Sequence, residues 1–162
     1  MRTGGGEGEA ARTIRVGVLG PQGLVSEATF ASDAEALKSA QSQADFPLVL
    51  PAWTPAGFGL ASIQISPKPT GPGPHRVRMG YQNNEAGLSL MEVSTPFDFP
   101  GKDSDHQVSS PIAGSELYRV SADGVTEFSL MTPTSGFVLT IRPGTAISDA
   151  DATRMLGSLP IK

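Results

Sequence analysis

The chain has 162 residues, which is enough for one domain with a substantial core and too few for two domains without a compositional break. Sixteen acidic residues against twelve basic ones give a net charge of −4, which opposes contact with a phosphate backbone and excludes nucleic acid as an expected partner. No cysteine occurs, which excludes disulfides, thiolate metal sites and thiol nucleophiles in this chain.

Residues 1–11 combine three consecutive glycines with two glutamates, a composition typical of a flexible tail. We therefore expect one folded domain over residues 12–162. No basic stretch is followed by an apolar run, and no stretch of about 18 apolar residues occurs. We expect neither a visible signal peptide nor a transmembrane segment in this chain.

The first predicted strand covers residues 13–19, where Ile14, Val16 and Val18 alternate with smaller or charged residues. The glycines of residues 17–23 suggest a phosphate-binding loop, but their spacing fits no common fingerprint and Pro21 removes an amide donor. Residues 18–30 also resemble the opening of prephenate dehydratases, in which Leu-Gly-Pro-x-Gly precedes Ser-Glu-Ala. Because nothing downstream predicts the α/β fold of that family, we interpret residues 20–23 as a plain turn.

A helix is predicted over residues 33–43. Ser32 followed three residues later by Glu35 forms a capping box, and Leu37 and Ala40 recur at helical spacing. The helix cannot continue through FPLVLP (46–51), because each proline lacks an amide donor and favours extended geometry before it. We expect this segment to run extended into WTPAGF (53–58).

The rest of the chain predicts strands at short intervals, with proline-rich or polar loops at residues 67–74 and 97–111. The turn residues 83–87 and the Asp123-Gly124 pair each predict an antiparallel hairpin. The predicted strands are residues 60–66, 75–81, 88–94, 116–121, 125–131 and 137–142.

A second helix is predicted after Ser148, where four apolar residues recur at i, i+3, i+4 and i+7 before Pro160. The strands otherwise follow one another without helices between them, which argues against a parallel doubly wound sheet. The expected fold is therefore α+β: an antiparallel sheet of about six strands, with an N-terminal and a C-terminal helix packed on it.

Catalytic motifs are weak. Asp103, Asp105 and His106 could hold a cation, but they lie in a polar loop without the calcium-binding pattern. No Gly-x-Ser-x-Gly elbow occurs, and neither His75 nor His106 has a recognisable nucleophile partner. We expect no enzyme activity, no metal and no cofactor.

Aromatic and arginine side chains are the candidate contact residues. Trp53 and Phe58 are large enough to anchor a partner or line an apolar groove, although core packing explains them equally. Arg76 and Arg78 share one face of the strand 75–81, opposite its apolar residues. Arg119 and Arg142 also lie on predicted strands and are expected on the same solvent face.

The order of these segments resembles an uncharacterised bacterial extracytoplasmic domain family, found in anti-sigma-factor-like and sporulation-associated proteins. In that family a Phe-Pro-x-x-x-Pro segment and then Pro-x-Gly-Phe/Tyr precede an antiparallel sheet, as residues 46–58 do here. The C-terminal domain of the MucB/RseB envelope-stress regulators begins similarly, with Trp-x-Pro-x-Gly-Phe. The resemblance spans residues 32–159 and implies an extracytoplasmic location and a binding or regulatory role without catalysis.

Three functions follow as hypotheses. The first is an extracytoplasmic interaction domain or accessory subunit of an envelope assembly, whose partner is a protein that can be membrane-associated and whose contact residues are Trp53, Phe58, Arg76 and Arg78. The second is a lipid or hydrophobic-ligand carrier, which requires an apolar cavity of about 300 Å³ or more. The third is an enzyme with a metal held by Asp103, Asp105 and His106.

Overall fold

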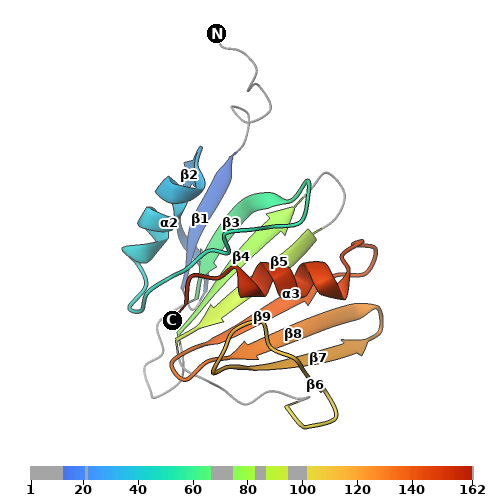
Figure 1. Ribbon diagram of the computed structural model, residues 1–162. Helices are drawn as coiled ribbons and strands as arrows, with labels where there is room; N and C mark the ends of the chain where they lie inside the picture. The colour runs from blue at the N-terminus through green and yellow to red at the C-terminus, as the bar shows by residue number, and fades with distance from the viewer. Residues whose placement is uncertain (1–12, 21, 67–74, 83–86, 95–101, 162) are drawn as a thin grey trace.

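One mixed sheet and two helices make up the computed structural model, which describes residues 13–20, 22–66, 75–82, 87–94 and 102–161 (Figure 1). Within those ranges the sheet has nine strands in the order β2-β1-β3-β4-β5-β9-β8-β7-β6. The elements are β1 (Ile14–Gly20), β2 (Gly23–Phe30), α2 (Asp33–Gln41), β3 (Gly59–Ile65), β4 (Arg76–Gln82), β5 (Gly87–Val93), β6 (Gln107–Val108), β7 (Glu116–Ala122), β8 (Val125–Met131), β9 (Gly136–Ile141) and α3 (Asp149–Gly157).

The mixed α+β class and the two helices agree with the sequence-based expectation, but the strand number and the wholly antiparallel pairing were wrong. The prediction missed β2 and β6. It took residues 20–23 for a turn without a following strand, and it placed residues 107–108 in a loop. β1 pairs with β3 in parallel, because β2 and α2 lie between them and carry the chain back to the same end of the sheet. The predicted tail (1–11) and the proline-rich loop (67–74) lie outside the described residues.

The two predicted hairpins are confirmed. β4 pairs with β5 in antiparallel register from Arg76 opposite Val93 to Gln82 opposite Gly87. Between β7 and β8, Asp123 and Gly124 have φ values of 55° and 81°. Both central residues of a tight hairpin turn need this left-handed conformation, which Asp tolerates and Gly adopts freely.

The core lies between the sheet and the two helices, which cover the same face (Figure 1). Register places apolar side chains in rows that cross the strands on that face. The longest row crosses six strands, and its members are Val16, Ile63, Met79, Leu90, Leu139 and Phe128. All six are at most 4% exposed, so the sheet presents one continuous apolar surface to the helices.

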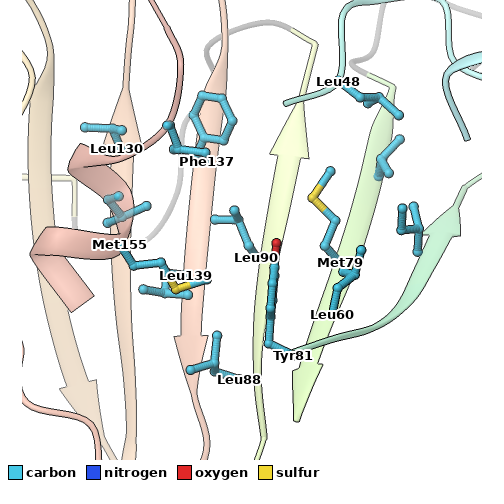
Figure 2. Close-up of a cluster of buried hydrophobic side chains, with 14 of the residues drawn as sticks. Leu48, Leu60, Met79, Tyr81, Leu88, Leu90, Leu130, Phe137, Leu139 and Met155 are labelled. Carbon is cyan, nitrogen blue, oxygen red and sulfur yellow. The ribbon is translucent and has the colours of Figure 1, made fainter. Parts of the chain in front are cut away.

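Both helices begin at the predicted serine caps. The hydroxyl of Ser32 accepts from the backbone N–H of Glu35 at 3.2 Å, and that of Ser148 accepts from Asp151 at 3.0 Å. α2 buries Ala36 and Ala40, while α3 buries three residues of its predicted stripe, Ala152, Met155 and Leu156. Figure 2 shows Met155 beside Leu139 of β9, within the cluster that also holds Leu90 and Leu130.

Residues 46–58 cross from α2 to β3 without regular secondary structure, so the helix ends before them, as predicted. Their backbone groups are paired with side chains and with the end of α3. Leu48 N–H donates to Oε1 of Gln41 at 2.7 Å, and the Gln41 amide donates to the carbonyl of Phe46 at 2.8 Å. Ala52 N–H donates to the carbonyl of Ser158 at 3.1 Å. The segment is therefore fixed to both helices despite having no ladder of its own.

Truncation of Met155 should test how much α3 contributes to stability. Met155→Ala removes a fully buried side chain, so we expect the free energy of unfolding to fall by about 2–5 kcal/mol, measured by urea denaturation. The matched control is Met91→Ala, which removes the same atoms from the partly exposed opposite face of β5. Equal losses for the two variants would contradict the placement of the main core cluster on the helix side.

Candidate functional site

The face of the sheet opposite the helices carries four arginines around small and polar residues, and we call it the arginine face. Arg76 and Arg78 are exposed on β4, in antiphase with the buried Val77 and Met79, as the sequence predicted. Arg15 belongs to the same face, because it pairs with Ser62 of β3. The arginine face consists of Arg15, Ser62, Gln64, Arg76, Arg78, Gly80, Ser89 and Arg142.

Two adjoining hollows lie on this face. One of about 200 Å³ is lined by Arg78 and Arg142 among others, and a second of about 180 Å³ is lined by Arg76 and Arg78. The larger hollow follows from the row Ser62, Gly80 and Ser89, whose side chains are small or missing. A Cβ on Gly80 would lie 2.7 Å from the Ser62 hydroxyl, so this position leaves no space for a larger residue without a shift.

The arginine face is cationic on a protein whose net charge is −4, and two exposed glutamates, Glu27 on β2 and Glu127 on β8, lie on the same side of the sheet outside this group. No ion pair is formed within the described ranges by Arg76, Arg78 or Arg142. Their guanidinium groups are therefore available to an anion. The expectation that Arg119 shares this face was wrong. Arg119 pairs with Phe128 in the ladder and therefore faces the helices, where its Nε lies 3.0 Å from Oδ2 of Asp149.

Trp53 and Phe58 lie on the helix side of the molecule, away from Arg76 and Arg78. Trp53 N–H donates to Oγ of Ser158 at 3.0 Å, and the guanidinium carbon of Arg154 lies 4.2 Å from the centre of the indole ring. Both aromatic side chains are half-buried and pack against the core. The four predicted contact residues therefore do not form one surface, because the sheet separates the aromatic pair from the arginine pair.

The suggested cation site has the geometry of a capped turn. Oδ1 of Asp103 lies 2.8 Å from Nδ1 of His106 and accepts from the backbone N–H of Asp105 at 3.0 Å. The hydrogen bond from His106 lowers the pKa of Asp103 below its usual range. No group of three His, Asp or Glu side chains that could hold a metal is found in the described part of the chain.

His75 is part of a buried network that the sequence did not reveal. Its Nδ1 lies 2.8 Å from Oδ1 of Asp45, and its Nε2 lies 2.8 Å from the backbone carbonyl of Ser66. Since both ring nitrogens face acceptors of the fold, the ring tethers the start of β4 to residues 45 and 66. The geometry does not resemble a nucleophile-activating histidine, which needs one nitrogen directed at a hydroxyl or thiol.

A pocket of about 620 Å³ lies where residues 46–49, the end of β5 and the C-terminal segment meet. It exceeds the volume that a ligand carrier requires. The apolar part of its lining consists of Phe46, Pro47, Val49, Pro160 and Ile161, and the polar part of Glu92, Ser94, Thr134 and Ser135.

Glu92 is the unusual residue of this pocket. It points to the core side of β5, between Val77 on β4 and Phe137 on β9, and it is 3% exposed. Its Oε1 accepts from the backbone N–H of Val49 at 3.1 Å, and no basic side chain contacts it within the described residues. Burial raises the pKa of Glu92 from 4.5 to about 7, and the hydrogen bond from Val49 opposes this shift.

The sequence-based prediction missed Glu92 and Arg15 as site residues, although the alternation of buried and exposed residues along β5 and β1 shows which face each one occupies. Glu92 is in phase with Leu88 and Leu90, so the pattern that buries those leucines also buries a carboxyl. Arg15 is out of phase with Ile14 and Val16, which places it on the solvent face.

No protein-family model matches the chain, and no curated protein sequence matches it. A search of solved structures finds the crystal structure of MucB in complex with MucA(peri), with a TM-score of 0.47 and 15% identity over 89% of this chain. The chain spans half the length of that MucB chain. Within the described residues, no helix is long and apolar enough to cross a membrane.

The raised pKa of Glu92 predicts a pH-dependent stability difference. In the unfolded chain this carboxyl loses its proton near pH 4.5, but in the folded chain only near pH 7. The group therefore stabilises the fold fully below pH 4.5, and that contribution is lost as the pH rises through 7. The loss amounts to about 3 kcal/mol.

Glu92→Gln keeps an acceptor for Val49 and cannot ionise, so its stability should rise relative to wild type between pH 4.5 and pH 8. Urea denaturation at several pH values measures this difference. Glu127→Gln, on the exposed opposite face of β8, is the matched control and should show no such trend. A constant difference between Glu92→Gln and wild type across this range would contradict the assigned pKa.

Proposed function

We propose that this protein is a non-catalytic binding domain that contacts an acidic segment of a protein partner through its arginine face. The observation that carries the proposal is the grouping of Arg76, Arg78 and Arg142 around two adjoining hollows, with no ion pair to any of them among the described residues. Guanidinium groups present planar, bidentate donors that match carboxylates. An acidic protein with a local cationic surface also steers an acidic segment to that surface rather than elsewhere.

The sequence resemblance to envelope-stress regulators supports a location outside the cytoplasm and a regulatory role, and we include both in the proposal. A membrane-associated partner is consistent with that location. Trp53 and Phe58 remain predicted contact residues for a second surface on the helix side. Both side chains are partly exposed there while they pack against the core, and the Arg154 guanidinium lies over the Trp53 ring.

The proposal is tested by comparing two variants of equal net charge. Arg76→Ala/Arg78→Ala removes two guanidinium groups from the arginine face. Lys38→Glu, the helix variant, lowers the net charge by the same amount at an exposed position of α2. Each protein is immobilised and incubated with envelope extract of its source, and the retained proteins are quantified by mass spectrometry.

We expect wild type and the helix variant to retain the same partner protein. Arg76→Ala/Arg78→Ala should retain at least about tenfold less of it, because each lost charge-assisted hydrogen bond weakens binding by about 1.5–3 kcal/mol. Peptides scanning the retained partner should place the binding segment in an acidic stretch. Equal retention by all three proteins, or no reproducible partner, would count against the arginine face. A Trp53→Ala variant tests the second surface in the same assay.

A further inference from the structure

We propose that the pocket around Glu92 binds a small amphiphilic amine, whose ammonium group contacts the Glu92 carboxylate and whose apolar body lies against Phe46, Val49 and Ile161. This site goes beyond the proposed function, because it lies on the helix side of the sheet and shares no residue with the arginine face. Its volume of about 620 Å³ is in the range of small-molecule sites.

The charge of the pocket selects the head group. Glu92 is the only ionisable side chain among its described lining residues, and none of these is basic. Among the described residues, only Oε1 of Glu92 has a hydrogen-bond partner, the backbone N–H of Val49, so Oε2 can accept from a ligand. A carboxylate without a positive partner in an apolar site is stabilised by an incoming ammonium group and repels an incoming carboxylate.

A purely structural role does not require the charge. The N–H of Val49 needs one acceptor, and the amide oxygen of glutamine would supply it without the cost of a buried carboxylate. The hydroxyl of Ser94 accepts from the backbone N–H of His75 at 2.9 Å, and that of Ser135 lies 2.9 Å from Oγ1 of Thr132. Glu92 is the one charged acceptor among the described lining residues of the pocket.

The apolar lining selects the body of the ligand. Phe46, Pro47 and Val49 come from the crossing segment, and Pro160 and Ile161 from the chain after α3. They present ring and branched aliphatic surfaces, which favour an aryl or alkyl group over a sugar or a phosphate. A fatty acid is disfavoured in this pocket, because the Glu92 carboxylate repels its head group.

Three probes with one scaffold and different head groups test the proposal: 4-phenylbutylamine, 4-phenylbutan-1-ol and 4-phenylbutyrate. Binding to the full chain is measured by NMR titration at pH 8, where Glu92 is mostly ionised and the amine carries its proton. We expect the amine to bind at least about tenfold more tightly than the alcohol and the carboxylate to bind most weakly.

Variants assign the effect to the pocket. Glu92→Gln should abolish the preference for the amine over the alcohol, while Glu127→Gln, which removes a carboxylate from the opposite face, should keep it. Ile161→Ala should weaken amine and alcohol to a similar extent, because both use the same apolar wall. Absence of amine binding, equal affinity for amine and alcohol, or an unchanged preference in Glu92→Gln would each overturn the proposal. None of these readouts depends on the arginine face, so either proposal can fail alone.

Discussion

The register of the sheet is the constraint on which the rest of this structure depends. Side chains alternate between faces along every strand, so pairing Val16 with Ile63 and Met79 with Leu90 places these apolar partners on one side. The two helices can cover that side because the row from Val16 on β1 to Phe128 on β8 is apolar throughout, while Glu92 interrupts the neighbouring row. The same register directs Arg76 and Arg78 to the opposite face. A slip of one residue in the pairing of β4 would bury both guanidinium groups and expose Val77 and Met79. The register of β4 therefore determines both the core and the cationic surface.

Most of the fold could be predicted because short sequence patterns specify its strands, helices and turns. Alternation identifies β4, serine caps mark α2 and α3, and the Asp123-Gly124 pair specifies the turn between β7 and β8. The edge strand β2 could not be identified in this way, because it is exposed along nearly its whole length and has no buried face to create a period. Its pairing with β1 is made by backbone hydrogen bonds, which leave no side-chain pattern. The parallel pairing of β1 with β3 joins strands that are far apart in the sequence, and no local pattern predicts such a contact.

The candidate sites likewise have parts that local patterns predict and parts that depend on contacts between distant segments. The arginines of β4 could be placed from their phase alone, and so could the burial of Glu92 in β5. The sequence could not show that Trp53 meets the end of α3, since Ser158 is 105 residues away and no local pattern connects the two residues. Nor could it show that residues 46–49 and 160–161 converge on Glu92 to form a pocket. The alternation along a strand shows which face of the sheet a side chain points to. The residues that surround it there depend on which distant segments of the chain pack against that face.

The β4–β5 hairpin carries both candidate sites, and the sheet keeps their opposite charges apart. Val77 is paired with Glu92 on the helix side, while Arg78 is paired with Met91 on the other. In this register no arginine of β4 can reach the Glu92 carboxylate, although Arg76 and Arg78 flank the residue paired with it. The guanidinium groups stay in water, where their charge costs little, and the carboxylate stays in an apolar site, where its charge is costly. A sheet that separates complementary charges in this way prevents them from neutralising one another, which is why we propose an acidic segment as the partner of one face and a small cation as the ligand of the other.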